Sequence, residues 1–250
     1  MSKELENKLI GSDLCELAVL LQSYGICNDI SPLQNAGNAC MSSATGATWR
    51  YKLDKIVFVA DEVGGRLTND STDITVSLSV DIVGFTNSVA QLSNPLDHLI
   101  FDLELNGLRL NPTTDTIENL YSAWHLDRHI FGPNDAKTKY SHPLYHFTFG
   151  GNKMEAKGHD TYGSALIMPS PRLIHPPMDA VLGVDFILQN YIHKNKINAL
   201  LSDKDYVNIV KNSQLRIWKP FFCSLYTHWE TNSYTVAPDF TAMKLFPLFH

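Results

Sequence analysis

The chain has 250 residues, of which 44% are hydrophobic and 18% charged, so it can bury a large core. Its formal net charge of −6 and pI near 5.9 argue against a protein that binds duplex nucleic acid, because that affinity comes from clustered Lys and Arg. The N-terminus lacks the apolar segment of a secretory signal, and no apolar run approaches the ~20 residues of a membrane span. We therefore expect a cytoplasmic protein.

Residues 1–50 are expected to form an N-terminal helix and a loop. Leucines recur near helical spacing over residues 3–26, where Gly25 offers a stop. Residues 28–49 are rich in Asn, Ser, Gly and Ala, which predicts a long connection containing at most a helical turn. The four cysteines form no CxxC pair, which favours buried free thiols over a thiolate zinc site or a disulfide framework: Cys15, Cys27, Cys40 and Cys223.

Strand patterns dominate residues 54–150. In TDITVSLSVDIVGF, apolar residues from Ile74 to Ile82 alternate with polar ones, and DHLIFDLELNG repeats the arrangement with Asp102 and Glu104 on the polar side. Asn106-Gly107 is expected to mark a turn or a bulge. Five successive segments of this kind predict an antiparallel meander with one buried face and one solvated face.

Residues 165–250 are expected to be helical. Pro176 and Pro177 precede an apolar stretch from Met178 to Ile192, in which Asp179 suits helix initiation, and residues 203–218 form a second amphipathic pattern. No repeat or linker divides the chain. The sequence thus predicts one α+β domain over residues 1–250, with a meander of about five strands, an N-terminal helix and C-terminal helices packed on one face.

Four of the ten histidines lie within residues 125–146. His125, Asp127 and His129 occupy alternate positions of one expected strand, and His142 and His146 lie in the next extended segment, so all five side chains could meet on the polar face. Imidazoles and a carboxylate so placed are ligands for a divalent zinc, manganese, iron or nickel ion, and an open position on that ion would activate water. The alternative is a solvated sheet face with no site.

Arg172 is the second polar feature. It follows a proline and precedes the expected helix entrance, so its guanidinium could hold a carboxylate or a phosphate, or could instead tie a loop to nearby carbonyls. The catalytic candidates are accordingly His142, His146, Asp127 and Arg172. Sequence signatures of nucleotide-binding loops, serine hydrolase elbows and EF-hands are missing.

The succession WHLDRH, HPLYHFTFGG and PRLIHPPMD, followed by a long apolar helix, resembles small uncharacterised prokaryotic families with an HPxxHxxxGG-like strand and a downstream Pro-Arg. The resemblance covers about residues 120–195. Such families are often found near toxin–antitoxin or phage-defence genes. The resemblance therefore implies a cytoplasmic prokaryotic protein with a partner protein, in a multi-gene defence or toxin–antitoxin system, and it transfers no catalytic residue.

Two functions of different classes follow. The first is an accessory or protein-interaction module, which acts through a partner protein or as a homo-oligomer and is suggested by the lack of a complete catalytic signature. The second is a metal-dependent hydrolase that acts on nucleic acid or a nucleotide through the His/Asp cluster, with Arg172 holding an anion. The first is the default expectation from the sequence.

Overall fold

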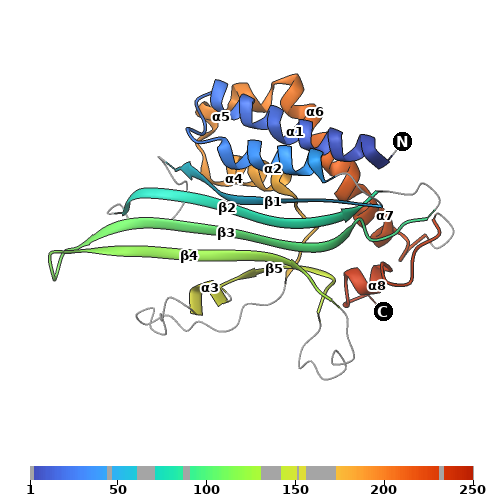
Figure 1. Cartoon of the computed structure of the whole chain (residues 1–250). Helices are drawn as coiled ribbons and strands as arrows, with labels where there is room; N and C mark the ends of the chain where they lie inside the picture. Colours follow the sequence, from blue (N-terminus) through green and yellow to red (C-terminus); the bar gives the residue numbers. More distant parts are fainter. Residues whose placement is uncertain are drawn as a thin grey trace.

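A computed structural model describes residues 3–43, 47–60, 71–86, 91–130, 142–150, 152–155, 173–230 and 234–249. Its centre is one antiparallel sheet whose strands lie side by side in the order of the chain (Figure 1). The strands are β1 (Thr48–Val59), β2 (Ser71–Phe85), β3 (Leu96–Asn111), β4 (Thr116–Arg128), β5 (Tyr145–Phe149) and β6 (Leu173–Ile174). The predicted α+β meander is confirmed, and β6 adds a short sixth strand.

Alternation along the strands separates two faces of this sheet. On the inner face, β2 and β3 carry apolar side chains that point toward the helices, and each of the following is at most 2% exposed: Val76, Leu78, Val80, Ile82, Leu99, Phe101 and Leu103. Their neighbours in sequence, including Asp81, Asp102 and Glu104, lie on the opposite side, which we call the open face. The core therefore lies between the inner face of the sheet and the helices.

Two N-terminal helices pack together and cover β1. Helix α1 (Lys3–Ser23) ends before Gly25, whose φ of +66° is the left-handed conformation that favours glycine after a helix. Helix α2 (Ser31–Ser42) occupies most of the segment expected to be a loop, so that prediction was wrong. Its small residues let the two helices approach closely: a Cβ on Gly37 would lie 2.7 Å from the Gly11 carbonyl oxygen.

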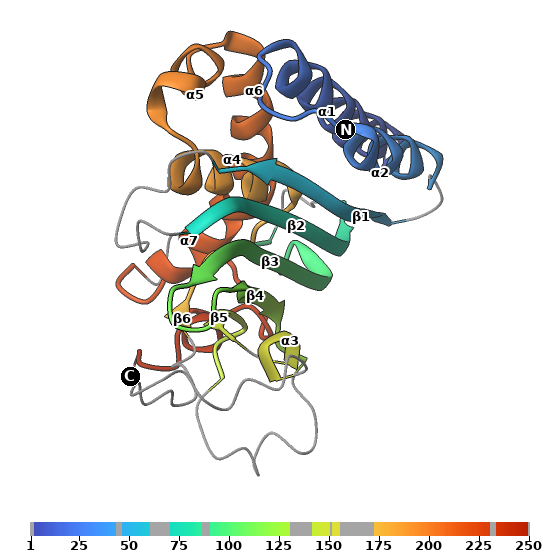
Figure 2. The same cartoon turned by 90° about the vertical axis from the view of Figure 1, so that its left-hand side faces the viewer.

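The C-terminal helices between Ala180 and Tyr226 lie on the same side of the sheet (Figure 2). Helix α4 (Ala180–Tyr191) begins at Asp179, whose carboxylate accepts a hydrogen bond from the Leu182 amide at 3.0 Å. Gly183 brings this helix against Phe101 and Leu78 of the sheet. The remaining helices are α5 (Lys194–Leu201), α6 (Lys204–Ser213), the π-helix η2 (Gln214–Trp218), α7 (Lys219–Tyr226) and α8 (Ala242–Leu245).

The hairpin of β3 and β4 extends well beyond the helices (Figure 1). Its turn lies at residues 112–115. At Asn106-Gly107, where a turn or a bulge was expected, β3 continues, and the irregularity lies in the opposite strand β2, whose register with β3 shifts between Thr72 and Thr75. The Asn111 side chain accepts hydrogen bonds from the Thr113 and Thr114 amides, and Asp115 takes a φ of 54°. An Asx turn, rather than an Asn-Gly pair, therefore reverses the chain.

Candidate metal centre

Three of the predicted ligands meet on the open face. His125 and Asp127 occupy alternate positions of β4, so both point to the same side, and His146 of β5 lies directly opposite Asp127 in the β4–β5 register. One ligand atom from each of the three residues lies within 4.8 Å of the other two. His125 Nε2 is 3.4 Å from Asp127 Oδ2. Two imidazoles and one carboxylate are thus brought together by the strand pairing alone.

The other two predicted ligands form the next part of the same cluster. The rings of His129 and His142 stack with centroids 4.5 Å apart and planes 9° from parallel, and His142 meets His146 edge-on at 5.9 Å. The His129 amide donates to the Leu144 carbonyl at 2.7 Å, which fixes the end of β4 beside the segment that leads into β5. Among the described residues, neither His129 nor His142 belongs to the group whose ligand atoms converge.

Asp127 is the carboxylate of this group, and it is partly removed from water. Burial raises the pKa of its carboxyl, and the neighbouring Asp102 carboxylate acts in the same direction, while His125 and His98 act against them. A carboxylate that is partly removed from water and lies beside another carboxylate is stabilised by a nearby positive charge. A divalent cation held by His125, Asp127 and His146 would supply that charge.

Thr148 is a polar neighbour of the three ligands that the sequence patterns did not single out. It is the cross-strand partner of His125 and lies two positions from His146, so its side chain shares their face. Within the described part of the chain, its buried Oγ1 makes no hydrogen bond. A hydroxyl in this position could donate to, or accept from, a water molecule on an ion.

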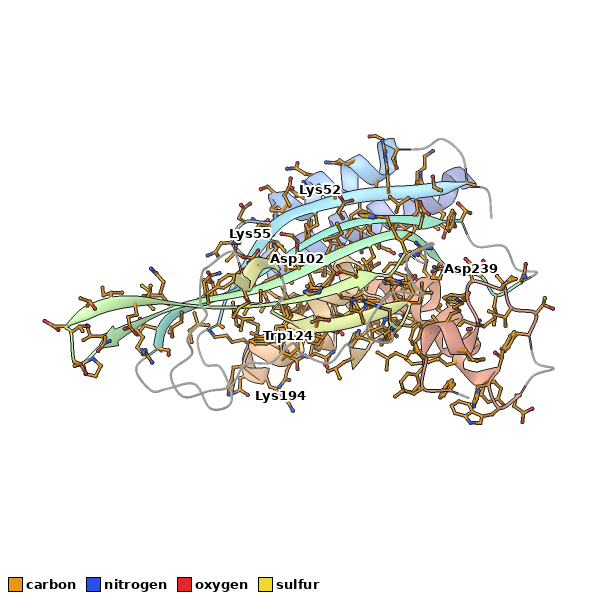
Figure 3. The ribbon with its side chains drawn as sticks, turned by 90° about the horizontal axis from the view of Figure 1, so that it is seen from below. Lys52, Lys55, Asp102, Trp124, Lys194 and Asp239 are labelled. Carbon is orange, nitrogen blue, oxygen red and sulfur yellow. The ribbon has the colours of Figure 1, made fainter. Side chains whose placement is uncertain are left out.

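A network of charged side chains borders the cluster on β3. The short helix α3 (Asn152–Glu155) places Lys153 Nζ 2.8 Å from Glu104 Oε1 and 3.1 Å from Asp102 Oδ2. Tyr121 donates to Glu104 at 3.1 Å, and Lys55 Nζ lies 3.9 Å from the same carboxylate. Figure 3 labels Lys55 and Asp102 on this face. The network joins α3 to the middle of the sheet.

The sequence predicts the positions of the two carboxylates of this network but not that of its lysine. Alternation in β3 predicts that Asp102 and Glu104 point outward, and both do. Lys153 carries no comparable signal, because it follows Gly150-Gly151 in a segment without periodicity and its position depends on how the chain turns after β5. Arg172, the predicted anion ligand, lies outside the described residues.

Comparisons of the chain with family models, with curated proteins and with solved structures gave no significant match. Among the helices of the described residues, none combines the length and the apolar character that crossing a membrane requires. The chemistry of the open face is therefore the available guide to function.

Proposed function

We propose that this protein binds a divalent metal ion through His125, Asp127 and His146 and acts as a metal-dependent hydrolase. The observation that carries the proposal is the convergence of these three ligand atoms on one sheet face. Two imidazoles and one carboxylate form a donor set found around catalytic zinc and non-haem iron. Because three protein ligands leave coordination positions open, such an ion can bind water and lower its pKa for attack on an ester.

The surroundings of the three ligands support this proposal. The raised pKa of Asp127 reflects a partly desolvated carboxylate, which an ion would neutralise. The Thr148 hydroxyl lies on the same face, where it could orient a bound water. The nucleic acid or nucleotide substrate expected for this function stays a prediction.

Metal analysis of protein purified without a His tag tests the proposal. After dialysis against zinc, iron(II) or manganese, the wild-type chain should retain a stoichiometric ion, and His146→Ala and Asp127→Asn should lose it. The same variants should abolish hydrolysis of bis(p-nitrophenyl) phosphate or p-nitrophenyl acetate. His193→Ala is the matched control, because His193 caps the distant helix α5 through the Asn195 amide. A folded wild-type chain that retains none of these ions would overturn the proposal.

The interaction module stays the alternative prediction. Leu110 and Ile117 are cross-strand neighbours near the hairpin tip and are 52% and 70% exposed. An exposed apolar pair suits contact with a partner protein, but nothing around it indicates the chemistry of that partner. The metal-dependent hydrolase is therefore the more specific of the two candidate functions.

A further inference from the structure

Lys153 links the short helix α3 to two carboxylates on the open face. Its ammonium contacts both Asp102 and Glu104 within 3.1 Å, while the side chain is only partly exposed. Burial acts to lower the pKa of Lys153, but its hydrogen bonds to Glu104 and Asp102 outweigh that effect and raise it. The group therefore remains a cation, and it compensates negative charge at the edge of the metal centre.

Asp102 lies within reach of the proposed ion. It is the direct cross-strand partner of His125, and it is diagonal to Asp127 in the β3–β4 register. Cβ atoms of direct partners on one face are about 4.5–5.5 Å apart, and those of diagonal neighbours are at most about 7–8 Å apart. Asp102 nevertheless lies outside the group of converging ligand atoms, and its carboxylate is turned toward Lys153.

The number of carboxylates within reach of an ion affects which ion a site prefers. Two imidazoles with one carboxylate suit zinc and its neighbours in the transition series, whereas each added carboxylate favours harder ions such as manganese(II). A free Asp102 side chain would be drawn to a divalent cation beside it, because opposite charges attract strongly where water is partly excluded. The ion pair with Lys153 opposes that movement.

We propose that Lys153 is the selectivity residue of this centre: by holding Asp102 in an ion pair, it keeps a second carboxylate from the ion and so favours zinc over manganese. This inference rests on the proposed metal site. It assigns α3 a function, because this helix carries the Lys153 ammonium that keeps Asp102 out of the group of metal ligands. Lys153 acts through Asp102 and is therefore a positioning residue.

Dissociation constants for Zn²⁺ and Mn²⁺, measured by competition with a fluorescent chelator, test the inference. Lys153→Met keeps the apolar part of the side chain but removes the charge. It should strengthen Mn²⁺ binding relative to Zn²⁺ on the order of tenfold, the scale of outer-shell effects on metal affinity. Adding Asp102→Asn to Lys153→Met should restore the wild-type ratio. Lys55→Met is the matched control, because Lys55 lies near Glu104 and no contact with Asp102 is found for it among the described residues.

The outcomes separate the two proposals. If the wild-type chain binds an ion that His146→Ala loses, but Lys153→Met leaves the Zn²⁺ to Mn²⁺ ratio unchanged, the metal site stands and the role of Lys153 is overturned. If the wild-type chain binds neither Zn²⁺ nor Mn²⁺, the role of Lys153 is overturned, and if it also retains no iron(II), the metal site fails as well. Should Lys153→Met unfold by circular dichroism, Lys153→Gln replaces it with the same expected gain for Mn²⁺, and an unchanged ratio overturns the role of Lys153. Loss of Zn²⁺ binding in Asp102→Asn alone would mean that Asp102 is itself a ligand, and would overturn that role as well.

Discussion

Arg216 is a buried cation that pairs with carboxylates from two different elements. Its guanidinium lies 3.5 Å from Asp13 of α1 and 3.6 Å from Asp179, the residue that caps α4, and its side chain is 9% exposed. Burial raises the pKa of Asp13 while Arg216 acts to lower it. The π-helix η2, which carries Arg216, thereby connects the N-terminal helices to the helix that covers the sheet.

Replacing Arg216 with Met should destabilise the protein by about 3–5 kcal/mol, because two buried carboxylates would lose their cation. Urea unfolding at pH 7 measures this loss. Burial already holds the pKa of the Asp13 carboxyl above its usual value, and loss of Arg216 should raise it further. The folded variant therefore binds a proton at Asp13 more tightly than the wild type does, so its stability increases more as the pH falls. The difference in the free energy of unfolding between wild type and variant should therefore become smaller from pH 7 toward pH 5. A loss below about 1 kcal/mol at pH 7 would contradict the argument.

The ligands of the proposed centre were predictable to different degrees. The period of two in WHLDRH is sufficient to place His125 and Asp127 on one face, because alternation is a local property of a strand. The position of His146 depends on register: a slip of one residue would have sent it to the inner face. Alternation places Thr148 on the face of His146 but does not single it out among polar strand residues. Lys153 carries no such signal, because its contacts with Asp102 and Glu104 depend on the path of the chain after β5.

At the scale of elements, helix α2 shows why composition misled the prediction. Gly, Ala, Ser and Asn are frequent in loops, yet Gly37 here lies where α1 and α2 almost touch, with Cys15 Sγ 2.6 Å and the Gly11 oxygen 2.7 Å from a built Cβ. The buried residues of α2 do follow helical spacing, at Leu33, Ala36, Gly37 and Cys40. Three of these four are small, because the space between the two helices is narrow, and a composition rich in small and polar residues obscured the period. Long strands with strict alternation carried no such ambiguity.

Gly37→Val should separate α1 from α2 and cost about 3 kcal/mol, the upper part of the range for overpacked cores, because one of the contacting atoms belongs to the backbone and cannot rotate away. The neighbouring change Asn38→Val is the control, since Asn38 is exposed and Val and Asn have similar helix propensities. Thermal unfolding followed by circular dichroism compares the two variants. Equal midpoints would show that the helices tolerate a wider spacing.

At the scale of the whole molecule, the inner face of the sheet forms the core and the open face carries the proposed metal centre. The large helices bury the inner face and provide the core, whereas α3 lies on the open face and contacts it through Lys153 (Figure 2). Stability and the proposed chemistry therefore reside on opposite sides of the same strands. A change on the open face should affect metal binding with little effect on folding, and the reverse should hold for the inner face.

The hairpin arm, residues 110–117, gives the sharpest test of this separation. It lies beyond the last β2–β3 pair, Ser71 with Arg109, and its apolar side chains Leu110 and Ile117 are exposed. Ile117 is eight positions from His125, about 27 Å along a strand. The arm therefore contributes to neither the core nor the metal centre.

Replacing residues 110–117 with Asn-Gly would join Arg109 to Glu118, which already pair across the hairpin, through a favoured two-residue turn. We expect the free energy of unfolding to stay within about 1 kcal/mol of the wild-type value, because the removed side chains are exposed apart from Asn111, which is half-buried and donates one hydrogen bond to Glu118. Metal content should not change. Urea unfolding and metal analysis of the shortened chain provide the two readouts, with Leu110→Ala/Ile117→Ala as a control that keeps the arm length. Loss of the ion with the fold intact would show that the far end of β4 helps to position His125 and Asp127, and that the two ends of the sheet are coupled.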